Sequence, residues 1–213
     1  MTYIVLDLEF NQGFNFEKNK TANIIPECRF EIIQIGAIKL NQNLEVVDKI
    51  NLYIKLNLYK EMHPHVKKLT GLDKEFLKDK LTFYEAYRDF SNFINKNNED
   101  DNTIYCVWGS GDLRALYRNM RYYGILNIND SLILKYIDIQ QIATEYLKFS
   151  KGGYIGLKHA IELLELPIEE VFHDALNDAK YTADIFKKIG DNSDIKNIIK
   201  VFNSKNVPNR SKS

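Results

Sequence analysis

Two acidic side chains one residue apart carry the clearest chemical signal in this chain. Asp7 and Glu9 lie at the end of an apolar run that begins at Tyr3. Side chains alternate between the faces of a strand, so both carboxylates are expected on one face and Leu8 on the other. Like charges this close repel each other, and a divalent cation is the simplest compensation. Hard cations such as Mg²⁺ or Mn²⁺ prefer carboxylate oxygens and suit phosphodiester hydrolysis. Taken alone, the pattern is also typical of an exposed charged face.

A third acidic residue, Asp112, follows a predicted strand over Thr103–Val107 and the stretch Trp108–Gly111. Ligand groups often gather where strands end in such sheets. An acidic residue in the first turn of a helix is equally explained by the exposed backbone amides and the helix dipole. The residues alone leave both interpretations open.

His173 and Asp178 form a further pair near the end of the chain. If both were helical, they would lie about 140° apart around the axis. We therefore expect the helix to begin after His173, with Asp174 as its N-cap, so that the imidazole can lean towards Asp178. A neutral imidazole can take a proton from an attacking water, so activity is expected to rise from acidic to neutral pH. The spacing alone also allows Asp174 to be the ligand in place of Asp178.

The elements that position these residues follow from periodicity. Strands are predicted over Tyr3–Leu8, Phe30–Leu40, Glu45–Lys55, Thr103–Val107 and Tyr136–Ile139. Helices are predicted over Thr82–Lys96, from Asp112 onwards, and over Gln140–Lys148, Leu157–Leu164 and Asp174–Ile189. A long loop is predicted over Asn11–Arg29, beside the carboxylate pair. The fold class is α/β, with an antiparallel hairpin and parallel strands flanked by helices.

Length and charge limit the options further. The 213 residues suit one domain with its own core. Lysine plus arginine and aspartate plus glutamate number 29 each, so the chain lacks the global basic field that holds duplex nucleic acid by charge alone. Any contact with nucleic acid must be local or mediated by metal.

Cysteine usage and the N-terminus indicate the compartment. Cys28 and Cys106 are far apart and form no Cys-x-x-Cys pattern, which argues against a disulfide framework and a zinc ribbon. The sequence shows no signal-type apolar stretch and no apolar segment of membrane-spanning length. We expect a cytoplasmic protein that is neither secreted nor inserted in a membrane.

The order of these motifs resembles the DEDDh family of 3′–5′ exonucleases, in the ribonuclease H-like superfamily. The resemblance runs from about Tyr3 to Gly190. Four stretches support it. Glu31–Ala37 is similar to the family's second strand, and Leu69–Leu72 to its substrate-side loop. Trp108–Asp112 is similar to the family's middle motif, and His173–Ala179 to its last motif. Within the family the chain looks closest to the bacterial KapD-like and ERI-1-like exonucleases, through Asp7–Phe10 and the pair Trp108-Gly109.

The resemblance implies a ribonuclease H-like fold with a mixed five-stranded sheet, and a two-metal-ion mechanism. Asp7, Glu9, Asp112 and Asp178 would hold two divalent ions, Mg²⁺ or Mn²⁺. His173 would be the general base and the fifth catalytic residue. The substrate would be the 3′ end of single-stranded RNA or DNA, released as nucleoside 5′-monophosphates.

Contacts to the substrate are expected near the carboxylate pair. The resemblance suggests Phe10, Thr70, Gly71 and Leu72 as substrate-binding residues. Strand alternation points Phe10 away from the metals unless the strand ends at Glu9. The loop with Phe14 and Phe16, and the stretch Met62–Gly71, are further places where terminal bases and sugars could bind.

The expected boundaries are an exonuclease domain over 1–190 and a polar C-terminal extension over 191–213, with a disordered end.

Two other functions stay open. One is a protein of the same fold that binds or scaffolds nucleic acid without cleaving it, although none of the five positions is lost here. The other is a hydrolase of very short oligonucleotides.

Overall fold

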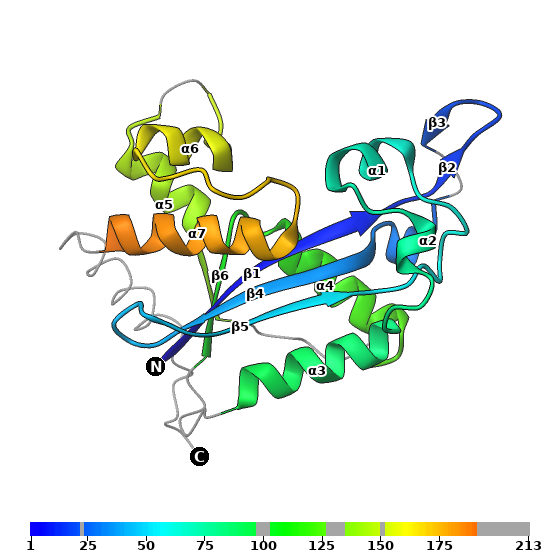
Figure 1. Ribbon diagram of the computed structural model, residues 1–213, viewed down its shortest axis with the longest axis horizontal. Coiled ribbons are helices and arrows are strands. Elements are labelled where there is room, and N and C mark those ends of the chain that lie inside the picture. Colours follow the sequence, from blue (N-terminus) through cyan, green and yellow to red (C-terminus); the bar gives the residue numbers. More distant parts are fainter. Residues whose placement is uncertain (22–23, 97–102, 127–134, 150–151, 191–213) are drawn as a thin grey trace, which may run out of the picture.

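The computed structural model describes residues 1–21, 24–96, 103–126, 135–149 and 152–190. Its main sheet has five strands in the order β5–β4–β1–β6–β7. These strands are β1 Thr2–Asn11, β4 Glu31–Leu40, β5 Val46–Tyr53, β6 Thr103–Val107 and β7 Tyr136–Asp138. β1, β4 and β5 pair antiparallel, whereas β6 and β7 run parallel to β1. The predicted mixed sheet with one hairpin is therefore confirmed (Figure 1).

Helices cover both faces of this sheet. They are α1 Pro64–Thr70, α2 Lys74–Leu77, α3 Phe83–Asn95, α4 Gly111–Tyr122, α5 Ile139–Tyr146, α6 Leu157–Leu163 and α7 Ala175–Gly190. One core lies between the sheet and α5, α6 and α7, and a second lies between the sheet and α3 and α4. No helix among the described residues has both the length and the apolarity to cross a membrane.

The alternation along β1 decides which way the acidic pair faces. Tyr3 and Val5 belong to the core under α7, whereas Ile4, Leu6 and Leu8 belong to the core over α3 and α4. Continuing the period of two places Asp7 and Glu9 on the α7 side of the sheet. The predicted shared face of the two carboxylates follows from this packing.

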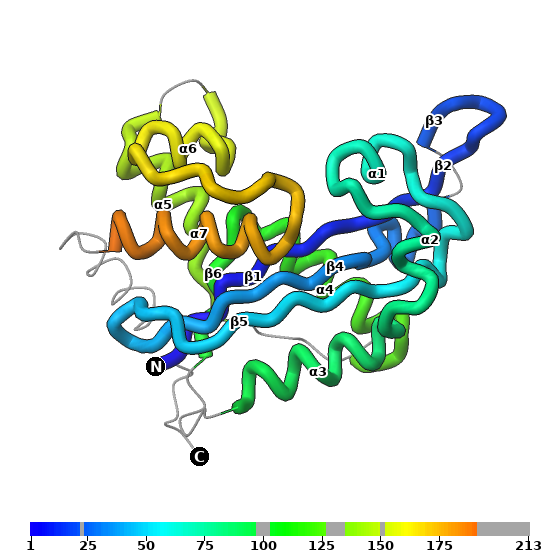
Figure 2. The backbone as a smooth tube through the Cα atoms, viewed as in Figure 1, coloured from blue at the N-terminus to red at the C-terminus, as the bar shows by residue number. Residues whose placement is uncertain are grey.

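The predicted loop over Asn11–Arg29 is more ordered than expected. β1 extends to Asn11, and the segment then forms a small hairpin of β2 Phe14–Asn15 and β3 Lys20–Thr21, and a 3₁₀ turn, η1 Pro26–Cys28. Figure 2 shows this hairpin projecting beyond the end of β1, next to α1. Two-residue strands are too short to produce a periodic pattern, so the sequence did not predict them.

Two further helices, α1 and α2, were not predicted either, because each is short and their side chains contribute little to the main core. The helix predicted from Thr82 is confirmed as α3, which starts with a capping box between Thr82 and Glu85. The predicted extension over 191–213 lies outside the described residues.

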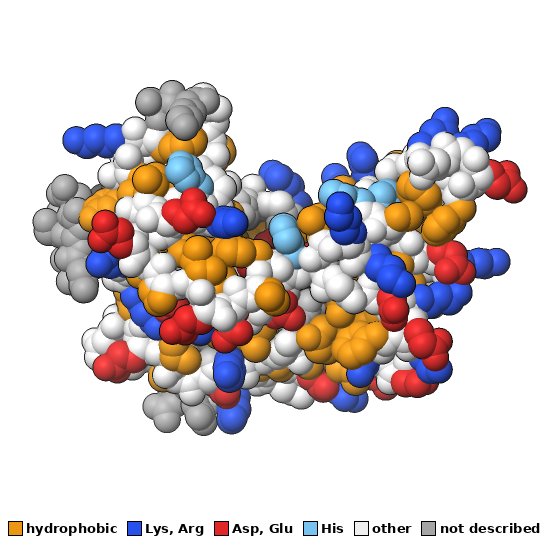
Figure 3. Space-filling model, turned by 45° about the horizontal axis from the view of Figure 1, so that its top comes forward, with side chains coloured by type: hydrophobic (Ala, Val, Ile, Leu, Met, Phe, Trp, Pro, Cys, Tyr) orange, Lys and Arg blue, Asp and Glu red, His pale blue; other side chains and the backbone are white. Residues whose placement is uncertain are grey.

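The outer surface is hollowed between two lobes (Figure 3). One lobe contains α5 and α6, and the other contains α1 and the β2–β3 hairpin. Histidine side chains lie in the hollow and on both lobes. The hollow lies where β1 ends and α7 begins, which is where the sequence places the chemistry.

Candidate active site

A close approach between β4 and α7 builds the site. Asp7 pairs with Gly36 across the β1–β4 ladder, and Glu9 pairs with Gln34. A Cβ atom at Gly36 would overlap the backbone of Ala175, the first residue of α7. Because Gly36 has no side chain, the start of α7 can lie directly on the sheet next to the two acids.

The start of α7 is fixed by a partly buried hydrogen-bond network. Asp174 Oδ1 accepts the N–H groups of Leu176 and Asn177 at 3.1 Å each, which makes Asp174 the N-cap as predicted. The buried Gln34 side chain donates to Asp174 Oδ2 at 2.7 Å and accepts the N–H of Ala175 at 3.3 Å. Strand β4 therefore holds the helix through side-chain contacts as well as by packing.

His173 lies outside the helix, on the loop that leads into it, as the sequence predicted. Its backbone has φ +65°, a left-handed conformation that is uncommon for a residue with a side chain. In this conformation its N–H donates to Asp178 Oδ2 at 3.1 Å, and its imidazole is exposed. The turn thus places an exposed base beside a buried acid.

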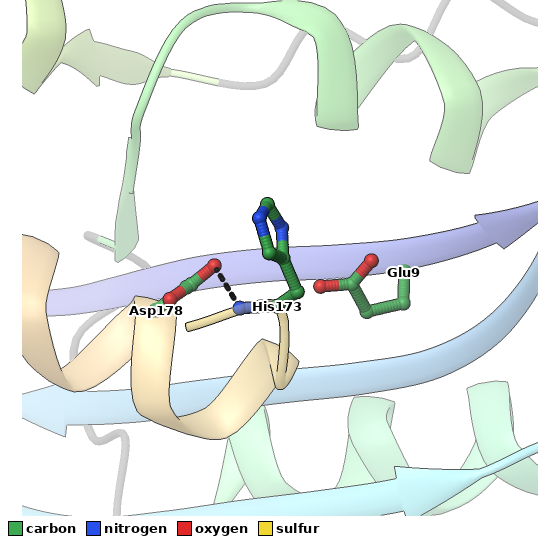
Figure 4. Close-up of side chains that lie close together, drawn as sticks. All are labelled: Glu9, His173 and Asp178. Atoms are coloured by element: carbon green, nitrogen blue, oxygen red, sulfur yellow. Dashed lines mark hydrogen bonds between the residues drawn. The ribbon is translucent and has the colours of Figure 1, made fainter. Parts of the chain in front are cut away.

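Three of the predicted residues come together around one point. Glu9, His173 and Asp178 each offer a ligand atom, and these atoms all lie within 4.8 Å of one another. Figure 4 shows the Glu9 carboxylate, from β1, directed towards His173 and Asp178, which lie at the start of α7. Asp178 Oδ1 is buried and receives no hydrogen bond from any residue that the structure describes.

The other two predicted acids, Asp7 and Asp112, interact with this cluster through charge repulsion. Burial, followed by repulsion from Asp112, raises the pKa of Asp7 well above its ordinary value. Burial, followed by repulsion from Glu9 and Asp178, does the same to the pKa of Asp112, the second residue of α4. Repulsion of this kind requires the carboxylates from β1, α4 and α7 to lie close to one another.

The pKa values of Glu9 and Asp178 are also raised. Burial and the nearby Asp178 and Asp174 carboxylates raise the pKa of Glu9 from 4.5 to about 8. Burial raises the pKa of Asp178 to about 6, although the hydrogen bond from the His173 N–H and the His173 imidazole lower it. A cation among these oxygens would remove the cost of ionising them.

The donor set fits a hard divalent cation. An unpartnered buried carboxylate oxygen at Asp178, with Glu9 and the imidazole nearby, is costly without a positive charge. Clustered carboxylates are the ligands that Mg²⁺ and Mn²⁺ prefer. The structure also favours Asp178 over Asp174 as the ligand, because the Asp174 oxygens are engaged by α7, Gln34 and Tyr53.

The four predicted substrate-binding residues occupy different environments. Phe10 packs into the core on the α3 and α4 side, with its ring 5.9 Å from that of Phe30, so it faces away from Asp7 and Glu9. Leu72 is buried in a small cluster with Met62. The stretch expected as a substrate-side loop is the end of α1: the Thr70 hydroxyl donates to Val66 O, and Gly71 caps the helix at φ +71°.

The roles of Gln34 and Gly36 were not predicted from the sequence. Both lie in the stretch Glu31–Ala37, and the available signal was a glutamine and a glycine between the isoleucines of a fully buried strand. A polar side chain in such a position must find a partner, and here its partner is the start of α7.

The match to a family agrees with this geometry. The family model RNase_T, described as an exonuclease, matches residues 4–186. The chain belongs to this exonuclease family. Family membership makes this exonuclease an enzyme that cleaves nucleic acid, and its order of acids and histidine resembles the DEDDh type. The expected closeness to the KapD-like and ERI-1-like group stays a prediction.

Solved structures share the fold of the exonuclease at low sequence identity. The nuclease domain of 3′hExo, a DEDDh family member bound to rAMP, has a TM-score of 0.74 and 20% identity, over 91% of this chain and 94% of that one. E. coli ExoI, in the zinc-bound form of its complex with single-stranded DNA, has a TM-score of 0.68 and 16% identity, over 94% of this chain and 43% of that one. S. pombe Pop2p, with Mg²⁺ and Mn²⁺ bound, has a TM-score of 0.64 and 18% identity, over 91% of this chain and 84% of that one. The fold is thus ribonuclease H-like. Among curated proteins, none matches the exonuclease.

Proposed function

We propose that this exonuclease removes nucleotides from the 3′ end of single-stranded RNA or DNA and releases nucleoside 5′-monophosphates. Its family membership supports the class of reaction. The similar structures named above include one bound to rAMP and one bound to single-stranded DNA, which supports the class of substrate. The Mg²⁺ and Mn²⁺ of the Pop2p structure support these two ions as cofactors.

The carboxylates would hold the metal ions. Asp7, Glu9 and Asp178 would bind one ion, Asp7 would share a second, and Asp112 would complete the site. When bound, such ions activate the attacking water and stabilise the leaving oxygen. The residues themselves supply a preformed group of carboxylate oxygens, because β1, α4 and α7 each contribute at least one of the acids.

His173 would be the general base. The water oxygen forms a bond to phosphorus as its proton passes to an imidazole nitrogen, and the bond from phosphorus to the 3′-oxygen of the preceding nucleotide breaks. The phosphate leaves with the released nucleotide. The exposed imidazole suits this role, since the His173 N–H is fixed by Asp178 while the ring lies beside Glu9 and Asp178 (Figure 4).

The observation that carries the proposal is Asp178 Oδ1, buried and without a hydrogen-bond partner among the described residues, in the cluster with Glu9 and His173. The test is Asp178→Asn, which keeps the size of the side chain and an oxygen for the His173 N–H. We expect Mn²⁺ to raise the melting temperature of the wild type but not of this variant, and activity to fall roughly 100-fold.

Asp184→Asn is the matched control, because Asp184 lies on the same helix and pairs with Lys187 at 3.4 Å. This variant should keep both the response to Mn²⁺ and the activity. Equal metal responses in wild type and Asp178→Asn would contradict the assignment of the ligand. A wild type that binds metal and strands without shortening them would support the non-cleaving alternative.

We further propose that residues 1–190 form the whole catalytic unit and that it acts in the cytoplasm. The family match ends at residue 186, within α7, which ends at Gly190. Cys28 and Cys106 are both free, buried thiols, as expected in a reducing compartment. Limited proteolysis would test the domain boundary by yielding a stable fragment that ends near residue 190.

A further inference from the structure

The β2–β3 hairpin has no part in the proposed chemistry, yet it begins only a few residues after Glu9. It leaves the end of β1 and stands beside α1, on one wall of the hollow that holds the site (Figures 1 and 3). A hairpin with two-residue strands is not stable by itself. Its position must therefore come from contacts with the rest of the domain.

A buried histidine provides these contacts. The His63 side chain is 7% exposed, and its Nε2 lies 3.0 Å from Thr21 Oγ1 in β3. His63 Nδ1 accepts the N–H of His65 at 3.2 Å, so in the neutral ring Nε2 carries the proton and donates it to Thr21. The Phe14 ring of β2 packs edge-to-face on the same imidazole, with the ring centroids 4.7 Å apart. One side chain thus anchors both strands.

Asn11 ties this anchor to the catalytic strand. It is the last residue of β1, and its side chain is fully buried. Its Oδ1 accepts the N–H of His63 at 2.9 Å, and its Nδ2 donates to Glu61 O at 3.0 Å. The hairpin is therefore held at a fixed place relative to Asp7 and Glu9.

The held hairpin exposes an aromatic ring and positive charge. Phe16 is 56% exposed and packs edge-to-face only on Phe14 among the aromatic rings described, with centroids 4.9 Å apart. Lys18 and Lys20 are exposed on the same hairpin and outnumber its single acid, Glu17. An exposed ring with neighbouring lysines is the combination that binds single strands, because bases stack on the ring and phosphates pair with the ammonium groups.

We propose that this hairpin is a clamp for the single strand upstream of the scissile bond, with Phe16 stacking on a base and Lys18 and Lys20 contacting phosphates. The inference rests on the proposed function, because it needs a nucleic-acid strand in the hollow. It explains how a chain with no net charge holds a polymer: the contact is local, beside the site.

The test compares Phe16→Ala with wild type on a single strand of about twelve nucleotides and on a dinucleotide. We expect the ratio of kcat/KM for the strand to that for the dinucleotide to fall about tenfold, through KM, because only the strand is long enough to reach the hairpin. Binding of a fluorescent strand in EDTA should weaken by a similar factor. Phe16→Trp keeps a stacking ring and should restore both values.

Tyr84→Ala is the matched control, since Tyr84 is an aromatic residue of similar exposure, 65%, at the start of α3. It should leave the ratio and the binding unchanged. Equal ratios and equal binding for Phe16→Ala and wild type would overturn the clamp while leaving the exonuclease intact.

A change in the size-exclusion elution volume of Phe16→Ala without a change in KM would overturn the clamp in favour of a contact between protein copies. A wild type that binds the strand but never cleaves it would refute the proposed function, and the EDTA binding data would still decide on the clamp.

Discussion

The acids of the site hold their protons more tightly than surface acids do, and this has a consequence for stability. The pKa of Glu9 is raised from 4.5 to about 8 in the folded chain, so between these values the folded state binds more protons than the unfolded state. The stabilising contribution is complete below about pH 4.5 and is lost as pH rises through about 8.

We therefore predict that, in a chelator, the free energy of unfolding of the wild type falls from about pH 5 to about pH 8. Glu9→Gln cannot ionise at this position, so its unfolding free energy should fall less over the same range. Urea unfolding at several pH values measures both. A difference between the two proteins that does not change with pH would contradict the assignment.

His173 gives a second prediction for a single residue. His173→Ala should lower kcat by about 100-fold or more, because it removes the proposed general base, and it should leave stabilisation by Mn²⁺ in place. His159→Ala is the control, since His159 is exposed on α6 and pairs with Glu162 at 3.5 Å. Single-turnover kinetics would measure the effect, and full activity of His173→Ala would remove this residue from the mechanism.

The residues of the site were largely predictable because local rules govern them. Alternation along β1 places Asp7 and Glu9 on one face, and the N-cap at Asp174 leaves His173 outside the helix. The choice between Asp174 and Asp178 needed coordinates, because it depends on which carboxylate is already engaged by Gln34.

The close packing of α7 on β4 explains why the strand carries a glycine. Gly36→Ala would place a Cβ atom in the backbone of Ala175, so α7 must shift away from the sheet. We predict a loss of at least about 3 kcal/mol in the free energy of unfolding, with lower activity in whatever fraction folds. Denaturant unfolding followed by circular dichroism measures this loss.

Gly156→Ala is the control for this change. Gly156 is the N-cap of α6, and a Cβ atom there would meet no other atom within 4 Å. It should cost no more than about 1 kcal/mol. Similar losses in both variants would contradict a specific clash between residue 36 and the backbone of α7.

Long, regular elements were predictable and short ones were not. The periodicity of α3, α4 and α7 and the apolar runs of β1 and β4 gave their type and approximate bounds. In contrast, α1, α2 and the β2–β3 hairpin depend on contacts distant in sequence, such as that between Thr21 and His63. Such contacts leave no local pattern. The sequence placed Phe14 and Phe16 near the substrate, but the hairpin and its anchor on His63 emerged only from the structure.

At the scale of the whole molecule, equal numbers of acidic and basic residues coexist with a strongly acidic site. Metal ions would neutralise the acids, and the lobe with α1 and the hairpin would supply the positive charge for the strand. The two lobes leave the hollow open at the surface, so a chain end can enter it (Figure 3). This arrangement suits the stepwise removal of nucleotides from an end.

The most direct test is degradation of matched RNA and DNA strands labelled at their 5′ ends, with and without Mg²⁺ or Mn²⁺. We predict a ladder of labelled fragments that shorten one nucleotide at a time, only when a divalent ion is present and not with Asp178→Asn. Immediate release of the label as a mononucleotide, or cleavage at internal sites only, would contradict 3′–5′ exonuclease activity.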